Sequence, residues 1–262
     1  MKILISFIFF VVTTSSFATT FEGKFIQGHF IIGKTEPGSE VFIDKKKVKV
    51  TNDGYFVFGL GRDRKNDIVI KINEKKIIKK VFKREYKIQR IDGLEEKKVT
   101  PPEEVYERIK RENKWIGEAR AINSDLTFFK NKFIIPVENA IITGVYGSQR
   151  ILNGKPKWPH YGLDFAADEG TEIKAMLDGT VTLVESDLFY TGGTLIFDHG
   201  HGISTLYMHM NKILVKKGEK VKQGDIIGTV GSTGRATGAH LDVRLNWFQK
   251  RLDPATVLDI NN

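Results

Sequence analysis

Three short motifs in the second half of the chain carry residue types that could do chemistry. They are His160-x3-Asp164, His209 in a Tyr-Met-His-Met segment, and His240-x-Asp242. These five side chains lie in segments that otherwise have the composition of buried strands, where burial of an isolated polar group costs free energy. Convergence on a metal ion explains them economically, because a catalytic zinc site takes three nitrogen or oxygen ligands and leaves a fourth position for water.

The elements that must position these motifs are predicted to be strands, since glycines punctuate the segments and helical periodicity is almost absent. The expected strands span residues 181–184, 194–198, 204–208, 226–230 and 240–245. Side chains two positions apart on a strand share a face, so His240 and Asp242 are expected to point into one cleft, with Arg244 on the same face. Leu241 and Val243 then point into the core.

The N-terminal half has a different pattern, of short alternating runs separated by turn signals. The expected strands are residues 30–32, 40–43, 47–50, 55–58 and 68–72. They predict a small antiparallel β-sandwich over residues 19–95, and a mainly β chain overall.

Thr100-Pro101-Pro102-Glu103 is typical of a helix start, which places a helical linker at residues 96–128. Its charged residues, Glu112 among them, are typical of a solvated face. Residues 129–262 form the predicted C-terminal antiparallel sheet or barrel-like domain.

The first residues have the three-part pattern of a secretory signal peptide. Lys2 precedes an apolar run over residues 3–12, and Ser16-Phe17-Ala18 supplies a cleavage signal. The pattern predicts a signal peptide at residues 1–18 and an exported protein, periplasmic or associated with the cell envelope. The apolar run is too short for a comfortable membrane span, so stable insertion after cleavage is not expected. The chain has no cysteine, and its fold must therefore close without disulfides.

The formal net charge of +9 predicts attraction to anionic partners. The basic residues are spread over residues 45–47, 75–80 and 108–114, without the interleaved aromatic residues of a nucleic-acid-binding motif. An acidic polymer of the cell envelope is preferred as the partner, and nucleic acid is not expected.

Taken in chain order, the motifs resemble those of the lysostaphin-like (LytM-type) zinc metallopeptidases of family M23. The resemblance covers residues 133–258. It is carried by Gly144-Val145-Tyr146-Gly147, His160-Tyr161-Gly162-Leu163-Asp164, Tyr207-Met208-His209-Met210, and the glycine-bounded residues 231–238 that lead into His240-Leu241-Asp242. It implies that His160 and Asp164 bind zinc, that His209 and His240 flank the water and the substrate carbonyl, and that the substrate is peptidoglycan.

One position departs from the family pattern, because Asp242 stands where the family has its third ligand, a histidine. Asp242 can be read as a direct ligand, as the ion-pair partner of Arg244, or as a carboxylate that orients a ligating water. We predict metal ligation by His160, Asp164 and Asp242. Two carboxylates weaken the Lewis acidity of zinc, and harder ions such as Mn²⁺ become more competitive.

The predicted activity is that of an exported zinc metalloendopeptidase that hydrolyses peptide bonds in peptidoglycan stem peptides or cross-links. One histidine of the pair His209 and His240 would accept the water proton, and the sequence does not assign which. The alternative is a degenerate domain that binds peptidoglycan, or activates another wall hydrolase among envelope protein partners, without hydrolysis.

Other motifs are given no catalytic role. Residues 215–228 also resemble the hairpin of biotinyl and lipoyl carrier domains, which supports the fold more than a function. His199 and His201 are interpreted as turn residues. Residues 149–157 and 187–193 are candidate walls of the substrate groove, in which Arg150 or Asn153 would contact substrate or cover the metal.

Overall fold

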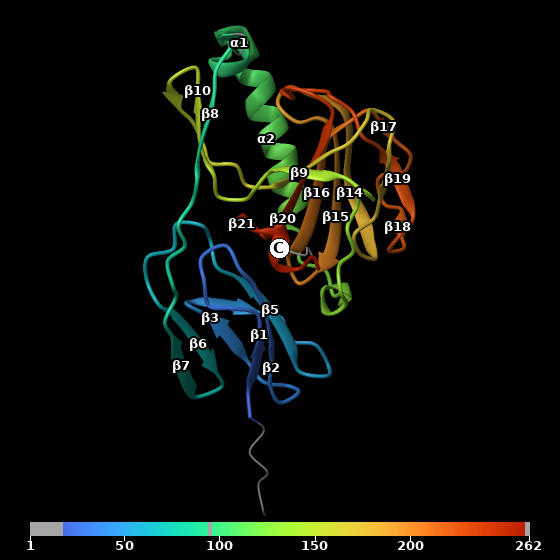
Figure 1. The fold of residues 1–262 in the computed structure, drawn as a ribbon. Helices are drawn as coiled ribbons and strands as arrows, with labels where there is room; N and C mark the ends of the chain where they lie inside the picture. Colours follow the sequence, from blue (N-terminus) through green and yellow to red (C-terminus); the bar gives the residue numbers. More distant parts are fainter. Residues whose placement is uncertain (1–17, 94–95, 260–262) are drawn as a thin grey trace, which may run out of the picture.

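The computed structural model describes residues 18–93 and 96–259, and its architecture is mainly β, as predicted (Figure 1). A small N-terminal β module is followed by a helical connection and a larger C-terminal β module. The predicted signal peptide lies outside the described residues except for Ala18. No helix in the described part of the chain is long and apolar enough to span a membrane.

Two antiparallel sheets form the N-terminal module, in the orders β1-β2-β5 and β4-β3-β6-β7. Their strands are β1 (Thr20–Glu22), β2 (Phe30–Lys34), β3 (Val41–Ile43), β4 (Lys46–Val48), β5 (Tyr55–Gly59), β6 (Ile68–Ile72) and β7 (Lys75–Lys79). The five expected strands correspond to β2 to β6. The expected strands include neither β1 nor β7. In β7, an edge strand, Ile77 packs against the core, while Ile78 and the lysines are exposed.

The C-terminal module is built on one large antiparallel sheet in the order β18-β14-β15-β16-β20-β12-β9, with β21 beside β20, and on a smaller sheet, β13-β19-β17. Their strands are β9 (Ile141–Gly144), β12 (Leu163–Ala166), β13 (Glu172–Lys174), β14 (Gly179–Leu188), β15 (Gly192–Gly200), β16 (Ile203–Met210), β17 (Lys212–Ile213), β18 (Lys220–Val221), β19 (Ile226–Thr229), β20 (His240–Trp247) and β21 (Lys250–Leu252). Short 3-10 turns lie at η2 (Phe128–Lys130) and η3 (Pro254–Thr256). Every residue of β15 and β16 is buried, because both faces of the sheet are covered there.

The helical connection covers one of those faces. It consists of α1 (Glu96–Val99), η1 (Glu103–Val105) and α2 (Tyr106–Ala121). Ala119 of α2 packs with Ile196 and Leu206 of the large sheet in a separate buried cluster. The prediction that its charged residues are solvated is wrong for Glu112, which is buried, pairs with Arg108 at 2.6 Å and accepts a hydrogen bond from the Phe189 N–H. The helix is therefore packed into the C-terminal module.

Strand β8 (Ile88–Ile91) carries a segment of the N-terminal half to the C-terminal module (Figure 1). It pairs in parallel with β10 (Gln149–Leu152), which in turn pairs with β11 (Lys155–Pro156). The Arg150 Nε–H donates to Gln89 Oε1 at 3.3 Å across a separation of 61 positions in the chain. This pairing brings the segment before the helix to the wall of the pocket described below.

The two β modules share one continuous cluster of buried hydrophobic residues. At the contact, a Cβ added to Gly59 would lie 2.4 Å from Leu252 Cδ2, so the glycine permits a close approach of the two modules. The N–H of Asp253 donates to the Gly28 carbonyl at 2.8 Å, and its carboxylate pairs with Arg84. The division into domains at residues 19–95, 96–128 and 129–262 stays a prediction.

Candidate metal centre and active site

Three buried side chains converge at the junction of β12 and β20. Asp164 on β12 lies opposite Asp242 on β20 in the antiparallel register, so both carboxylates project from the same face. His160 precedes β12, and its Nε2 lies 3.0 Å from Asp164 Oδ1 and 3.3 Å from Asp242 Oδ2. The chain therefore brings together the three side chains that the sequence predicts as metal ligands.

The donor set of these residues fits a divalent cation. One ligand atom from each of them lies within 4.8 Å of the other two, and all three residues are buried. Asp164 Oδ1 is buried and faces His160 Nε2 at 3.0 Å without a well-directed hydrogen bond, so a cation or a proton on that nitrogen must compensate its charge. One imidazole and two carboxylates are ordinary ligands for zinc.

The electrostatics of the cluster favour charged carboxylates. Burial alone would raise the pKa of Asp242, but the Arg244 guanidinium and His160 outweigh it and hold that pKa well below its ordinary value. Burial would lower the pKa of His160, but the carboxylates of Asp242 and Asp164 outweigh it and raise that pKa. A proton and a metal ion therefore compete for His160 Nε2.

Two arginines contact the same carboxylates. Arg244 Nη2 lies 3.0 Å from Asp242 Oδ2, the oxygen that also faces His160, and Arg244 Nε lies 3.4 Å from Oδ1. Arg150 Nη2 lies 3.5 Å from Asp164 Oδ2. Asp242 thus forms the ion pair with Arg244 that the sequence suggested as one of its roles. The same carboxylate also faces His160, so the ion pair and the metal-ligand role involve one group.

Glycines make room for both carboxylates. A Cβ at Gly144 would lie 2.0 Å from Asp164 Oδ2, and one at Gly162 would lie 1.9 Å from Asp242 Oδ1. Both glycines belong to the motifs quoted above. Their role here is close approach to a carboxylate, which a side chain would prevent.

The two remaining histidines lie beside this cluster, with ring centroids 4.7 Å apart. His209 on β16 donates from Nδ1 to the Thr233 carbonyl at 2.8 Å, and His240 on β20 donates from Nδ1 to the Gly238 carbonyl at 2.9 Å. These bonds fix the tautomers and leave the lone pair on Nε2 of each ring. His240 Nε2 lies 4.0 Å from Asp164 Oδ1.

His209 is held in an unusual state. Its φ of 64° lies in the left-handed region, which is uncommon for a residue other than glycine and often marks a functional position. Burial lowers its pKa to about 4, so the ring is neutral near pH 7.

The prediction that His240 and Asp242 share one face of their strand is also confirmed, because Leu241 and Val243 are fully buried while His240 and Asp242 face the site.

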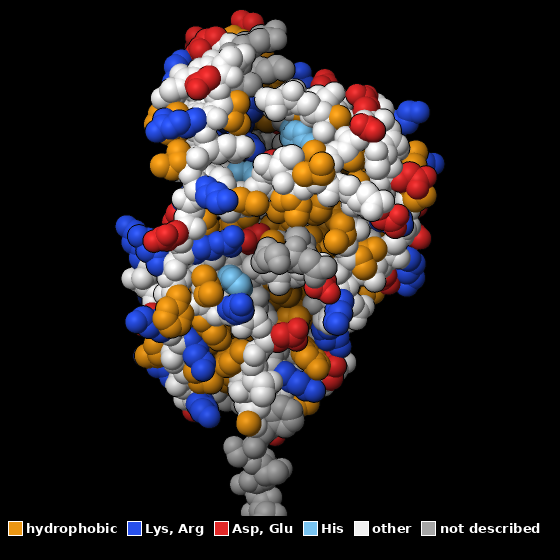
Figure 2. Space-filling model, viewed as in Figure 1, with side chains coloured by type: hydrophobic (Ala, Val, Ile, Leu, Met, Phe, Trp, Pro, Cys, Tyr) orange, Lys and Arg blue, Asp and Glu red, His pale blue; other side chains and the backbone are white. Residues whose placement is uncertain are grey.

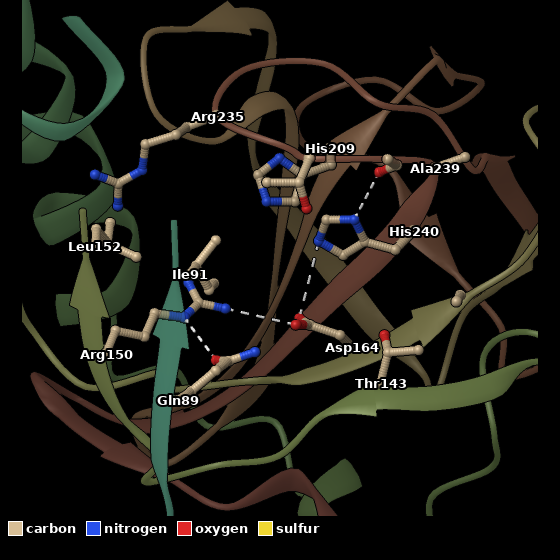
Figure 3. A pocket seen from close by; sticks show the side chains of 13 residues that line it. Gln89, Ile91, Thr143, Arg150, Leu152, Asp164, His209, Arg235, Ala239 and His240 are labelled. Atoms are coloured by element: carbon tan, nitrogen blue, oxygen red, sulfur yellow. Dashed lines mark hydrogen bonds and ion pairs between the residues drawn. The ribbon is translucent and has the colours of Figure 1, made fainter. Parts of the chain in front are cut away.

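A pocket of ≈ 330 Å³ opens over Asp164, His209 and His240 (Figure 3). Histidine side chains are visible at a hollow of the surface in Figure 2. The opposite wall includes Arg150 from the segment that the sequence marked as a groove wall, together with Gln89 and Arg235, which sequence reasoning missed. No residue of 187–193 lines this pocket. Gln89 gave no signal in the sequence, whereas Arg235 lies inside the glycine-bounded residues 231–238.

His199 and His201 lie away from the metal cluster, as expected. His199 donates from Nδ1 to the Asp178 carbonyl at 2.7 Å and accepts at Nε2 from the Thr205 hydroxyl at 2.7 Å. It belongs to β15, so its interpretation as a turn residue is wrong, while His201 does lie in the turn after β15. Burial lowers the pKa of His199 to about 4. Its role is structural.

Comparison with known proteins agrees with this geometry. Residues 158–254 match the model of Peptidase family M23, so the C-terminal module of the chain carries an M23 peptidase domain. The peptidoglycan DD-endopeptidase ShyA of Vibrio cholerae is 45% identical over 87 residues, which cover 33% of this chain and 20% of that protein. The DD-carboxypeptidase/endopeptidase Mpg of Neisseria meningitidis is 40% identical over 98 residues, covering 37% of this chain and 22% of that protein. The matched region is about a fifth of the length of these relatives.

A solved structure extends the similarity to the N-terminal module. The crystal structure of a putative peptidase M23 from Pseudomonas aeruginosa is 28% identical, with a TM-score of 0.69, and the match covers 89% of this chain and 95% of that one. The arrangement of both β modules is thus shared with that structure.

Proposed function

We propose that this protein is a zinc metalloendopeptidase that hydrolyses peptide bonds in peptidoglycan stem peptides or cross-links. The observation that carries the proposal is the convergence of His160, Asp164 and Asp242 beside two histidines whose Nδ1 atoms are each bonded to a backbone carbonyl. The match of residues 158–254 to Peptidase family M23 and the peptidoglycan peptidase activities named for ShyA and Mpg support it.

The proposed ligands are His160, Asp164 and Asp242, and they would hold one zinc ion. Zinc bound there would polarise the scissile carbonyl and lower the pKa of a water molecule. Because two of the three ligands are carboxylates, Mn²⁺ or another hard divalent ion is the alternative occupant. His160 is oriented for ligation by its Nδ1, which lies 3.3 Å from the Val145 carbonyl.

We assign the proton transfer to His240. Its Nε2 carries the lone pair and lies near Asp164, so it can accept the water proton and later donate it to the leaving amine nitrogen. His209 has a pKa of about 4, which makes its ring a weak base near pH 7. Its place beside His240 suits a supporting role in binding the water and the substrate carbonyl.

We place the protein in the periplasm or cell envelope, where it would meet peptidoglycan. The signal-peptide pattern in residues 1–18 and the activities named for the relatives support this placement. Lys and Arg side chains spread over the N-terminal module, which suits an anionic polymer (Figure 2). Envelope protein partners remain part of the proposal.

A non-hydrolytic peptidoglycan-binding domain is the second candidate. The observation in its favour is that Arg244 forms an ion pair with Asp242 and Arg150 forms one with Asp164, so each carboxylate already has a cationic neighbour. If those ion pairs keep the metal out, the pocket would bind peptides without cleaving them.

Digestion of isolated peptidoglycan separates the two candidates. Mature protein loaded with zinc is incubated with the polymer, and released peptides are identified by mass spectrometry. We expect release by wild type, loss of release in His160→Ala, and unchanged release in the control His29→Gln, whose histidine lies in the N-terminal module. Binding without release by the zinc-loaded wild type would support the second candidate.

A further inference from the structure

A further cleft, of ≈ 350 Å³, lies at the junction of the two β modules. One wall comes from the loop after β5 and the other from β21 and the turn before it, and β21 lies where the two modules meet in Figure 1. The cleft shares no lining residue with the pocket beside His240. Its lining is basic, with the side chains of Arg62, Arg64, Lys250 and Arg251.

Two of these four cations already have carboxylate partners. Arg64 binds both oxygens of Asp44, with Nη1 2.8 Å from Oδ2 and Nη2 3.0 Å from Oδ1. Arg62 pairs with Asp63, the neighbouring residue, at 2.5 Å. Asp44 also attracts Lys250, although both of its oxygens are bonded to Arg64. The acidic groups beside the cleft are therefore engaged by the two arginines of the loop.

Arg251 and Lys250 form no ion pair with a carboxylate in the described part of the chain. The guanidinium carbon of Arg251 lies 5.0 Å from the centroid of the Tyr161 ring. The Lys250 ammonium lies 4.7 Å from the centroid of the Trp247 ring. An aromatic face attracts a cation but does not neutralise its charge. Stacking also fixes the plane of a guanidinium while its edge can still form two parallel hydrogen bonds.

A buried arginine near Arg251 increases the positive charge on this side of the molecule. Arg120 of α2 is only 4% exposed, donates from Nη2 to the Phe248 carbonyl at 3.1 Å, and has no hydrogen-bond partner at Nε. Burial, together with the charges of Arg251 and Arg244, lowers the pKa of Arg120 to about 9. Of these three arginines, Arg244 alone forms an ion pair among the described residues. An anion beside Arg251 would offset this repulsion between buried and half-buried cations.

We propose that Arg251 and Lys250 form a binding site for an oxyanion, a phosphate or a carboxylate group, at the junction of the two β modules. Consecutive residues of a strand project to opposite sides, so the two cations reach the cleft from the two faces of β21. Arginine binds both kinds of oxyanion through two directed hydrogen bonds. Because the opposite wall belongs to the N-terminal module, the bound anion would stabilise the junction. The site is independent of the proposed hydrolysis, which uses none of the residues that line this cleft.

The test is calorimetry on zinc-loaded full-length mature protein. The titrants are inorganic phosphate and glutarate, a dicarboxylate that represents peptide carboxylates, with chloride at equal ionic strength as the reference. The variants are Arg251→Gln, Arg251→Lys and Lys250→Gln. The matched control Arg111→Gln removes a cation that also stacks on an aromatic ring, that of Trp115, outside the cleft. Circular dichroism checks folding, and Lys250→Gln, at an exposed position, replaces Arg251→Gln in the test if that variant is unfolded.

We expect phosphate or glutarate to bind the wild type more tightly than chloride does and to raise its melting temperature. Arg251→Gln should weaken the binding about tenfold to a hundredfold, and Lys250→Gln should weaken it less. Arg251→Lys should keep part of the affinity, and Arg111→Gln should keep all of it. The anion that binds more tightly identifies the source of the group, a phosphate ester or a peptide carboxylate.

Three results would overturn the site. The first is an equal effect of chloride, which would indicate general screening of charge. The second is binding that survives both glutamine variants. The third is phosphate binding that survives Arg251→Gln and disappears in His160→Ala, which would place the anion at the metal centre.

Peptide release from peptidoglycan, measured on the same samples, tests the hydrolysis separately. A wild type that binds the anion and releases no peptides would support the site and contradict the peptidase. A wild type that releases peptides and binds neither anion would overturn the site and leave the peptidase standing.

Discussion

Asp164 and Asp242 lie directly opposite each other on the antiparallel strands β12 and β20, and His160 Nε2 lies within 3.3 Å of an oxygen of each. Two like charges so close together are stable only with cations beside them. Arg244 and Arg150 provide part of that compensation, and a divalent metal ion would provide the rest.

Replacing Arg244 tests this charge balance. In Arg244→Gln, Asp242 loses its guanidinium partner, so the metal-free protein should be less stable and the metal should bind more tightly. We expect a lower melting temperature without zinc and a larger rise on adding zinc than in wild type. Thermal unfolding with and without zinc measures both. Equal zinc-induced shifts in Arg244→Gln and wild type would contradict the competition between Arg244 and the metal.

The glycine beside Asp242 gives a steric test. Gly162→Ala would place a Cβ where Asp242 Oδ1 now lies, so the carboxylate must move. We expect zinc affinity to fall by more than about tenfold. Gly117→Ala is the control, because a Cβ there meets nothing within 4 Å and alanine favours the helix by up to about 1 kcal/mol. Competition with a zinc-binding dye measures the affinity, and unchanged affinity in Gly162→Ala would argue against Asp242 as a ligand.

Replacing His240 should lower turnover without removing zinc, whereas replacing a ligand should remove both. His240→Ala should lower kcat by about 10²- to 10⁴-fold while zinc remains bound, because the change removes the proton acceptor and leaves the ligands in place. Turnover of a soluble stem peptide and metal content are measured on the same samples. A variant with full zinc content and wild-type kcat would exclude His240 from proton transfer.

His199 predicts a pH dependence of stability. Its pKa is lowered to about 4 in the folded chain from an ordinary 6.5, so the unfolded chain binds the proton more tightly. The stabilisation is present above pH 6.5 and is lost as the pH falls toward 4, with a loss of about 3 kcal/mol in the free energy of unfolding. Denaturant unfolding of the metal-free protein at several pH values measures the slope. His199→Gln should reduce the slope, and an identical slope would refute the assignment.

Much of the site could be predicted because its residues belong to short motifs on regular strands. The i and i+2 geometry of a strand is local, so the common face of His240 and Asp242 follows from their spacing. The ion pair of Asp242 with Arg244 is local for the same reason.

The parts that could not be predicted depend on distant segments. Gln89 reaches the pocket because β8 pairs in parallel with β10, a long-range contact that leaves no periodic signal in the sequence. Glu112 has the appearance of a surface residue until Arg108 and the Phe189 N–H are brought to it by packing. Lysine-rich β7 is a strand because β6 offers it an edge, although its composition is unfavourable for a strand.

The most direct test of the metallopeptidase account is metal analysis of purified mature protein, with release of peptides from peptidoglycan measured on the same samples. Wild type should hold about one zinc ion per chain and release peptides. Asp242→Ala and His160→Ala should lose both the zinc and the activity while remaining folded. A wild-type protein that takes up no zinc or other divalent ion and releases nothing, yet still binds peptidoglycan, would contradict the account.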